Sequence, residues 1–230
     1  MIQLGVFAKY WQPGEVKTRL AKSIGATEAA NLYRAFLECL LARFGDFGHD
    51  RVLNFTPCHQ RQAFSNMLPA GWRLAEQGDG DLGQRMRRYF EQFHAETVTA
   101  DSTAILIGSD APTLPHQRLR RAAVELESTA VVLGPSDDGG YYLIGLRRDA
   151  LSPELLGGLF DEMPWSEPAL LMETVERLKH HCVGFSLLEP WYDVDDYDAL
   201  VKLRQELRAE LHEEPAFRQL GRMVDALFDE

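Results

Sequence analysis

Short apolar runs alternate with amphipathic helical segments along this chain, and that alternation limits the folds open to it. The runs that predict strands are residues 2–8, 51–55, 72–76, 104–107, the two apolar parts of 131–146, and 185–188. Between and after them, helical spacing predicts helices at 27–44, 59–68, 84–93, 117–127, from 170 onward, 197–211 and 217–228. Strands that alternate with helices form a mainly parallel sheet covered on both faces. The sequence therefore predicts the α/β class.

The segment 131–146 contains the most unusual loop of the chain. Between its two apolar runs stand Ser136, Asp137, Asp138, Gly139 and Gly140. The two glycines permit positive φ angles and the close approach of a ligand. An Asp-Gly pair between apolar runs is also the ordinary signal of a hairpin turn, and both interpretations can hold together. Because a plain turn does not require the preceding Ser136 and Asp137, we predict that this loop is functional.

Aspartates follow two of the expected strands. Asp110 comes after the strand 104–107, and an acid at the carboxyl end of a central strand points into the crevice where open α/β sheets bind ligands. Asp193 and Asp195 are two residues apart in an extended segment, so they point the same way and can hold one divalent cation. The alternative is an Asp-rich helix entry, in which Asp196 caps the helix 197–211.

The first loop is basic although the chain as a whole is acidic. Lys plus Arg is 24 and Asp plus Glu is 35, so the net charge is −11 and nucleic acid is not an expected partner. Lys9, Lys17 and Arg19 nevertheless surround a turn at Gly14, directly after the first strand. A loop of this kind typically holds phosphates, whereas the alternative is a solvated basic face. We predict phosphate binding by Lys9, Gly14, Lys17 and Arg19.

A glycine-rich segment, G-x-G-x-x-G at residues 78–83, follows an expected strand and opens a helix. Taken alone it indicates dinucleotide binding, and Asp101 falls near the spacing of a ribose-binding acid. Two aspartates inside the motif would face the pyrophosphate, so dinucleotide binding is the lesser alternative here. We assign Asp81 and Arg85 to the binding of a nucleotide.

Bulk features restrict the remaining classes. No segment reaches the roughly 20 apolar residues of a membrane span, and the first residues lack the pattern of a signal peptide, so a cytoplasmic protein is expected. Three widely spaced cysteines, Cys39, Cys58 and Cys182, disfavour a disulfide framework or a zinc site. The length of 230 residues favours a single domain, 1–230.

Several segments together resemble one bacterial family. They are, in order, FAKYWQPGEVKTRLA, QGDGDLGQRM, GSDAPTL, LGPSDDGGYYLIGL, MPWS and DVDDYDAL. The family is DUF2064, or transferase 1, rSAM/selenodomain-associated, in the nucleotide-diphospho-sugar transferase superfamily. The resemblance covers nearly the whole chain. It implies the GT-A fold, a three-layer α/β/α sandwich in which carboxylates at the carboxyl edge of the sheet hold Mg²⁺ or Mn²⁺.

The resemblance also implies roles for particular positions. Asp110, Asp193 and Asp195 match metal-binding acids, whereas Gly139 and Gly140 match an acceptor or sugar loop. Lys9, Lys17 and Arg19 fall on the phosphate loop, which is similar to the K-T-R-L run of phospholactate guanylyltransferases. That loop commonly reads F-A-K-x-P, but here Tyr10, Trp11 and Gln12 precede Pro13.

Two residues of the MPWS segment are further candidates for the substrate loop. Trp165 can line a pocket or pack in the core, and Ser166 can cap the following helix.

These features fit metal-assisted transfer without a covalent intermediate, because no nucleophile motif is present. We expect a glycosyltransferase that moves a sugar from a nucleotide-diphospho-sugar to a small acceptor, with Asp110, Asp138 and Lys17 as catalytic residues. Asp137 or Asp138 would orient the acceptor hydroxyl. One alternative is a nucleotidyltransferase of the guanylyltransferase kind, which joins a nucleoside triphosphate to a phosphorylated acceptor and releases pyrophosphate. Another is a nucleotide-binding module without catalytic activity.

Overall fold

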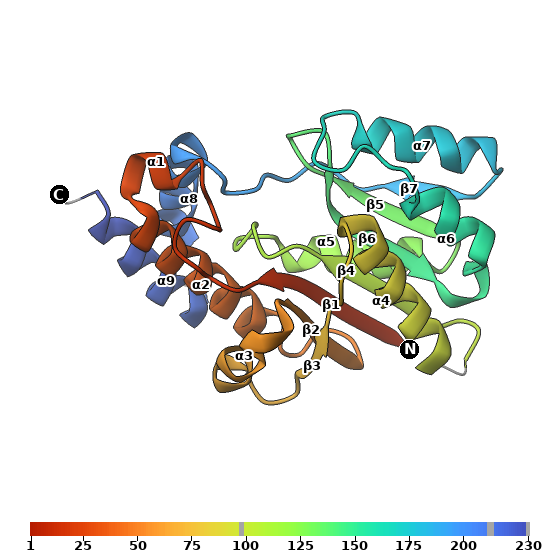
Figure 1. Cartoon of the computed structure of the whole chain (residues 1–230), viewed down its shortest axis with the longest axis horizontal. Coiled ribbons are helices and arrows are strands. Elements are labelled where there is room, and N and C mark those ends of the chain that lie inside the picture. The colour runs from red at the N-terminus through yellow and green to blue at the C-terminus, as the bar shows by residue number, and fades with distance from the viewer. Residues whose placement is uncertain (97–98, 211–213, 229–230) are drawn as a thin grey trace.

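The computed structural model describes residues 1–96, 99–210 and 214–228, apart from the side chain of Glu210. Within these ranges, seven strands form one sheet (Figure 1): β1 Ile2–Lys9, β2 Asp50–Thr56, β3 Arg73–Glu76, β4 Thr103–Ile107, β5 Val131–Pro135, β6 Tyr141–Arg147 and β7 Phe185–Leu187. Their order is β3-β2-β1-β4-β6-β5-β7. Only β6 runs antiparallel to its neighbours, β4 and β5. The mainly parallel α/β fold is therefore confirmed.

The helices that connect these strands cover both faces of the sheet. They are α1 Ala21–Ile24, α2 Ala26–Arg43, α3 Arg61–Met67, α4 Leu82–Glu96, α5 His116–Glu125, α6 Pro153–Phe160, α7 Leu170–His180, α8 Tyr197–Glu210 and α9 Pro215–Ala226, with 3₁₀ turns at Cys58–Gln60 and Arg148–Ala150. No helix in the described part of the chain is long and apolar enough to cross a bilayer.

Alternation along the strands divides the core into two layers. On one face, Leu37 of α2 and Leu119 of α5 are buried with Val6 of β1, and α3 joins the same cluster. On the other face, Phe90 of α4 is buried with Leu106 of β4, together with side chains of α6 and α7. Successive strand residues point to opposite faces, so β1, β4, β5 and β6 contribute to both layers. The result is the α/β/α sandwich expected from the sequence.

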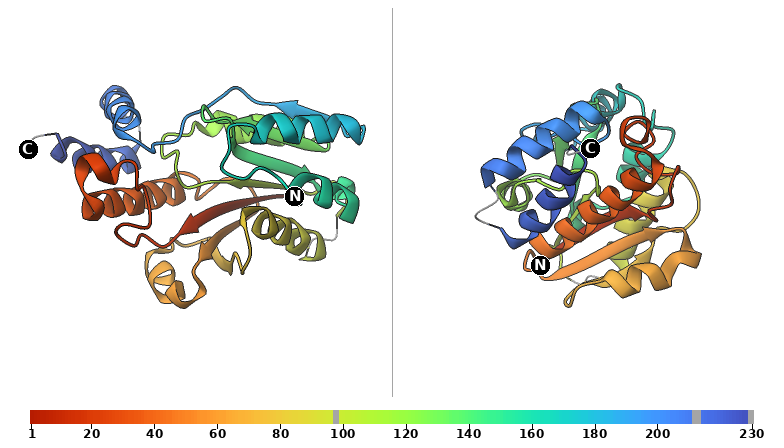
Figure 2. Two further views of the ribbon diagram at one scale, coloured as in Figure 1. Left: turned by 45° about the horizontal axis from the view of Figure 1, so that its top comes forward. Right: turned by 90° about the vertical axis from the view of Figure 1, so that its left-hand side faces the viewer.

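A third cluster lies at one end of the molecule. There the other side of α2 packs against α8 and α9 through Phe36, Leu203 and Phe217, which are almost completely buried. These helices gather beyond the carboxyl end of β1, as the views from two sides agree (Figures 1 and 2). Helix α2 is therefore shared between the sheet and the helical end.

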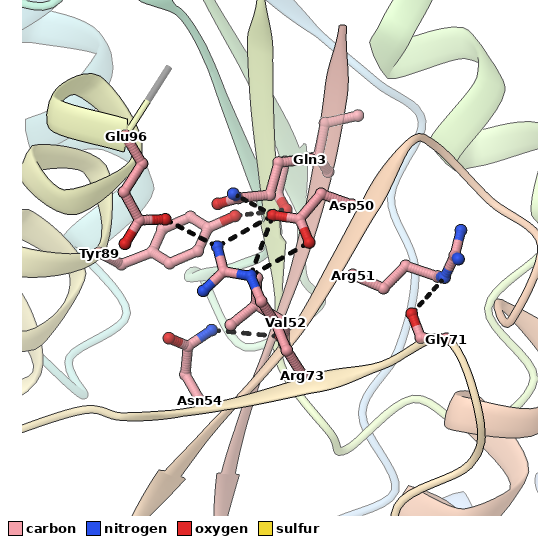
Figure 3. Close-up of polar contacts among 10 residues, drawn as sticks. Gln3, Asp50, Arg51, Val52, Asn54, Gly71, Arg73, Tyr89 and Glu96 are labelled. Atoms are coloured by element: carbon pink, nitrogen blue, oxygen red, sulfur yellow. Dashed lines mark hydrogen bonds and ion pairs between the residues drawn. The ribbon is translucent and has the colours of Figure 1, made fainter.

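A polar network joins the strands at the opposite end of the sheet, where β1, β2 and β3 begin (Figure 3). Gln3 donates from Nε2 to Oδ2 of Asp50 at 2.7 Å, and Arg73 donates to both oxygens of the same carboxylate. Arg73 also donates to Glu96 of α4 at 3.0 Å. This network joins β1, β2, β3 and α4 at the ends of the strands that lie away from the loops described below.

Two helices differ from the predicted pattern, and one predicted cap is confirmed. Helix α2 begins at Ala26, one residue before its expected start, and Gly25 enters it at φ 86° with no side-chain cap. Helix α6 was not expected from the sequence. Asp196 does cap α8, since its Oδ1 accepts the N–H of Ala199 at 2.9 Å. Residue 211, the expected end of that helix, lies outside the described residues.

Candidate functional site

The loops at the carboxyl ends of β4 and β7 meet, and their acidic residues meet with them. The backbone N–H of Val194 donates to the carbonyl of Asp110 at 2.9 Å. Asp193 and Asp195 flank Val194, so this hydrogen bond places Asp110 beside both. The expected convergence of the three acids is therefore present in the fold.

Lys17 joins this cluster, which the sequence did not indicate. Its ammonium contacts Oδ1 of Asp110 and lies 2.8 Å from Oδ1 of Asp195. The side chain of Lys17 is only 2% exposed, whereas those of Asp110 and Asp195 are 41% and 43% exposed. Burial by itself would lower the pKa of Lys17, but the two carboxylates raise that pKa above its ordinary value, so the ammonium stays charged.

Asp193 has the most perturbed carboxyl group of the cluster. Burial is the main cause, and the nearby charges of Asp110 and Asp195 add to it, although Lys17 acts in the opposite direction. Together they raise the pKa of Asp193 to about 7. A carboxyl group that titrates near neutrality beside other carboxylates is typical of functional sites.

The chemistry of these donors suits a hard divalent cation, because carboxylate oxygens are the ligands that Mg²⁺ and Mn²⁺ prefer. Their arrangement does not enclose one. Among the described residues, no three Asp, Glu, His or Cys side chains gather closely enough to hold a metal ion. Oδ1 of both Asp110 and Asp195 already faces the ammonium of Lys17. As it stands, the site is a cluster of acids around an internal cation.

A cavity of about 330 Å³ opens on one side of this cluster. Its walls come from the carboxyl ends of β1, β2 and β4, from the start of β6, and from α4. Aromatic and apolar groups predominate, among them Phe7, Tyr141 and Trp165, and the polar groups include Gln77 and Arg85. Asp110 and Asp193 form its border with the acid cluster.

A second cavity, of about 390 Å³, lies on the other side. Its lining contains six aspartates and two cations: Asp137, Asp138, Asp193, Asp195, Asp196 and Asp198, with Arg19 and Lys202. Asp193 lines both cavities. The acid cluster thus stands between an apolar, aromatic space and an acidic one.

Tyr33 of α2 connects the first loop to the cluster. Its hydroxyl accepts the N–H of Lys9 at 3.0 Å and shares a hydrogen bond of 2.7 Å with the hydroxyl of Ser109. Burial, and then the charge of Asp110, raise the pKa of Tyr33 to about 12, so the phenol stays neutral. Tyr33 therefore fixes the end of β1 against the end of β4.

The four residues of the expected phosphate loop lie in different environments. Lys9 is half exposed, borders the first cavity and donates to the carbonyl of Glu15 at 3.0 Å. Gly14 takes a positive φ of 83° in an exposed turn, where an added Cβ would meet no atom within 4 Å. Arg19 is exposed and lines the second cavity. Lys17 is buried beneath the carboxylates, so the four residues do not form one phosphate cradle in this conformation.

The two residues assigned beside the glycine-rich segment have different places. Asp81 accepts the N–H of Gln84 through Oδ1 at 2.8 Å, while Gln84 accepts the N–H of Asp81, which is a capping box at the start of α4. Helix capping thus explains Asp81, which is exposed and does not line the first cavity. Arg85, one turn later, does line that cavity and donates to the carbonyl of Gly80 at 2.9 Å.

The loop at residues 136–140 is both a turn and a cavity wall. Oδ1 of Asp138 accepts the N–H of Gly140 at 3.0 Å and the hydroxyl of Ser136, while Asp137 and Asp138 line the second cavity. Gly139 has φ 90°, and a Cβ there would lie 2.2 Å from the carbonyl oxygen of Pro168. Its close neighbour is therefore the protein backbone, and the expected ligand approach is not needed to explain this glycine.

Trp165 and Ser166, the two candidates of the MPWS segment, also lie in different environments. Trp165 lines the first cavity and stacks on Phe160 with ring centroids 6.5 Å apart. Ser166 is exposed at φ 67° and does not cap a helix, because α7 begins four residues later, at Leu170. The expectation of a cap was wrong, since the chain makes an extra turn after the tryptophan.

Three contributors were missed at the level of sequence: Tyr33, Gln77 and Glu206. Gln77 is buried and donates to the carbonyls of Ala8 and Asn54, at 3.0 and 2.9 Å, which shapes the first cavity. Glu206 of α8 accepts the hydroxyls of Thr113 and Tyr192, at 2.9 and 2.7 Å. Gln77 opens the QGDGDLGQRM segment, which was the available signal for it. Tyr33 and Glu206 lie in helices, far in sequence from the loops that they support, so no local motif could have identified them.

Known structures share this fold. A protein of Desulfovibrio desulfuricans G20, provisionally named a nucleotide-diphospho-sugar transferase, is 30% identical, with a TM-score of 0.86 over 98% of this chain and 96% of that one. The 4-diphosphocytidyl-2C-methyl-D-erythritol synthase of Anaerococcus prevotii DSM 20548 is 8% identical, with a TM-score of 0.56 over 90% of this chain and 98% of that one. The inositol-1-phosphate CTP transferase of T. maritima is 12% identical, with a TM-score of 0.53 over 96% of this chain and 95% of that one. At such low identities the last two show the fold alone.

The comparison of the chain with curated proteins found no match, whereas one family model matches its sequence. Residues 40–167 match DUF2064, described as an uncharacterized protein conserved in bacteria. The match spans more than half of the chain and includes Asp110, the loop at 136–140 and Trp165, whereas Lys17, Asp193 and Asp195 lie outside it. The chain belongs to the DUF2064 family, and its fold is of the nucleotide-diphospho-sugar transferase kind.

Proposed function

We propose that this protein transfers a sugar from a nucleotide-diphospho-sugar to a small hydroxyl acceptor. The observation that carries the proposal is the position of the acid cluster between two cavities of different character, with Asp193 lining both. A transferase must hold a donor and an acceptor on either side of one reacting centre. The 30% identical protein named as a nucleotide-diphospho-sugar transferase supports the same class of donor.

The first cavity suits the nucleotide half of the donor. Phe7, Tyr141 and Trp165 offer flat apolar surface for a ring, and Gln77 and Arg85 offer polar groups among them. The diphosphate would then lie toward the acid cluster, within reach of Lys9. In the reaction, the bond between the sugar and the diphosphate breaks, and the acceptor oxygen forms the new bond to the sugar.

The second cavity suits an acceptor that donates hydrogen bonds. Its six aspartates outnumber its two cations, so a hydroxyl group is a better fit there than a phosphate. Oδ1 of Asp138 is held by the backbone of its own loop, and its Oδ2 has no hydrogen bond to other described residues. We assign to Asp138 the orientation of the acceptor hydroxyl and the removal of its proton.

The proposal includes a requirement for Mg²⁺ or Mn²⁺. Asp110, Asp193 and Asp195 are the residues that would hold the ion, whose charge would offset the charge that builds on the departing diphosphate. Since the ammonium of Lys17 contacts Oδ1 of both Asp110 and Asp195, the ion would have to share these two carboxylates with it.

Nucleotidyl transfer is the second candidate, and one observation favours it. The first loop brings Lys9, Lys17 and Arg19 to the region of the acid cluster, and a triphosphate carries more charge to neutralise than a diphosphate. In that reaction an acceptor phosphate attacks the α-phosphorus and pyrophosphate departs.

The decisive experiment is a donor screen with the purified protein and Mg²⁺ or Mn²⁺. Sugar nucleotides and nucleoside triphosphates are tested separately, and the release of nucleoside diphosphate and of pyrophosphate is measured. Diphosphate from a sugar nucleotide is the expected product. Pyrophosphate from a triphosphate would replace glycosyl by nucleotidyl transfer. If nucleotides raise the melting temperature equally with and without metal, and neither product is formed, the protein is a non-catalytic binding module.

A further inference from the structure

The ammonium of Lys17 occupies a position that a metal ion would be expected to take. It contacts Oδ1 of Asp110 and Oδ1 of Asp195, two carboxylates that come from loops far apart in the chain. Asp193 stands beside them, and its raised pKa reflects mainly burial and then the charge of Asp110. One internal cation therefore partly neutralises the cluster.

The surroundings of Lys17 hold it in this position. Its side chain is 2% exposed, and its Nζ lies 5.9 Å from the ring centroid of Tyr33 and 5.7 Å from that of Phe36. The backbone of Lys17 has φ 47°, an uncommon conformation for a residue other than glycine. A hydrogen bond of 2.8 Å from the N–H of Ala21 to the carbonyl of Lys17 helps to fix it.

Exposure differs between the two sides of the ion pairs. Lys17 approaches from the protein interior, whereas Asp110 and Asp195 keep more than two fifths of their side chains accessible. A divalent cation would have to bind these acids from the accessible side, close to an ammonium that is buried on the interior side. Like charges at such distances repel strongly in a partly buried site.

We propose that Lys17 is a resident counter-ion that makes the binding of a divalent cation depend on nucleotide phosphates. Without nucleotide, the ammonium competes electrostatically with the metal for Asp110 and Asp195. A nucleotide brings phosphate oxygens, which are further ligands for the metal, and negative charge that offsets the ammonium. Metal and nucleotide therefore bind cooperatively. This inference deepens the proposed function and rests on it, since it assumes a metal-nucleotide site at these acids.

The test measures Mn²⁺ binding to the full-length, metal-free protein, from the loss of the electron paramagnetic resonance signal of free Mn²⁺. Titrations are run without nucleotide, with uridine diphosphate and with guanosine diphosphate, and chelation by each nucleotide alone is subtracted. The neutral variants are Lys17→Met and Lys17→Gln. The matched control is Lys22→Met, which removes an equal charge from an exposed position in the last turn of α1.

In the wild-type protein, at least one of the two nucleotides is expected to raise the Mn²⁺ affinity by about tenfold or more. Without nucleotide, both Lys17 variants are expected to bind Mn²⁺ at least about tenfold more tightly than the wild type, and to gain less from nucleotide. Lys22→Met should behave as the wild type. Thermal melts establish that each variant is folded, and the wild-type comparison needs no variant at all.

Two results would overturn the inference. One is a wild-type Mn²⁺ affinity that neither nucleotide changes. The other is a folded Lys17→Met or Lys17→Gln protein that binds Mn²⁺ no more tightly than the wild type. If either occurs while the donor screen still yields metal-dependent transfer, only the counter-ion role of Lys17 fails. If no variant binds Mn²⁺ under any condition and no transfer is found, the metal-dependent function fails with it.

Discussion

At the residue scale, Asp138 has both a structural and a chemical assignment, and one substitution can separate them. Asparagine keeps an oxygen that can accept from Gly140 and Ser136 but loses the charge. We expect Asp138→Asn to lower the transfer rate about a hundredfold or more, as for the loss of a general base, with an unchanged melting temperature. Asp137→Asn is the comparison in steady-state assays. If Asp137→Asn gives the large loss and Asp138→Asn does not, the roles of the two residues are reversed.

Asp193 shows how a site residue can reduce stability. Its pKa in the folded protein is about 7, above the ordinary aspartate value of about 4. Between these two pH values the folded protein keeps a proton that the unfolded chain has lost, so stability falls as the pH rises through this window. In metal-free protein, Asp193→Asn should therefore raise the melting temperature more at pH 8 than at pH 5. An equal gain at both pH values would show that Asp193 is not protonated in the fold.

The sequence predicted the acidic residues of the site but not the position of Lys17 among them. The spacing of Asp193 and Asp195, and the place of Asp110 after a strand, predicted that acids would converge, and the hydrogen bond from Val194 to Asp110 brings them together. The same reasoning placed Lys17 on a phosphate loop, whereas it is buried under the carboxylates. A run of basic residues indicates a local charge, but only tertiary packing determines which of them turns inward.

At the scale of elements, α8 supports the acid cluster from a distance. Glu206 accepts from Thr113, three residues after Asp110, and from Tyr192, directly before Asp193. Loss of these two hydrogen bonds should leave the residues that line both cavities in place, but should align the acidic residues less well. We expect Glu206→Ala to lower kcat about tenfold to a hundredfold with little change in the KM of the donor.

Two variants control for that prediction. Gln205→Ala, at an exposed position of the same helix, should leave kcat unchanged, and Glu206→Gln should recover part of the activity because an acceptor oxygen remains. A rise in KM with an unchanged kcat would contradict a positioning role for Glu206.

The polar network of Figure 3 gives the sheet a pH-dependent connection. Burial alone would raise the pKa of Asp50, but hydrogen bonds and charge from Arg73 hold that pKa below its ordinary value. Stability from this group is therefore present above the unfolded pKa and is lost as the pH falls through the folded pKa. Asp50→Asn should lower the melting temperature at pH 7, and the difference from the wild type should shrink toward pH 3.

An exposed ion pair provides the matched control for Asp50. Arg61 and Glu76 lie 3.0 Å apart, with side chains 53% and 42% exposed. Because solvent screens such pairs, Glu76→Gln should change the melting temperature little at any pH. A difference for Asp50→Asn that is constant between pH 7 and pH 3 would contradict the role of its charge.

Helix α6 shows why one element was not expected from the sequence. Its local signals favour a helix, because Ser152 accepts the N–H of Leu155 at 3.1 Å and Pro153 stands in the first turn. Gly157 and Gly158 in its middle, however, each lower helix propensity by about 1 kcal/mol relative to Ala. Burial of Leu159 and Phe160 against α4 and the sheet outweighs that cost, and such burial cannot be read from eight residues.

At the scale of the whole molecule, most strands and helices could be predicted in their order along the chain, but the packing of the helical end could not. Its closing helices were expected, yet nothing in their spacing indicates that α8 and α9 pack on α2 and leave the sheet to α3 and α5. One side of α2 contributes Leu37, Leu40 and Leu41 to the sheet core, and the other contributes Leu32 and Phe36 to the helical end. A helix with two buried sides couples the two regions energetically.

That coupling predicts that the chain unfolds as a single cooperative domain. Phe217 of α9 is 2% exposed within the helical end, and truncation of a buried phenylalanine typically costs about 3 to 5 kcal/mol. Since α2 cannot lose its helical-end contacts without disturbing the sheet, Phe217→Ala should shift the urea midpoint of the whole protein. Far-ultraviolet circular dichroism should report the same shift as tryptophan fluorescence, to which Trp72 and Trp165 contribute from the two layers of the sheet core. A lower midpoint in the dichroism while the fluorescence transition stays in place would instead show two separately folding units.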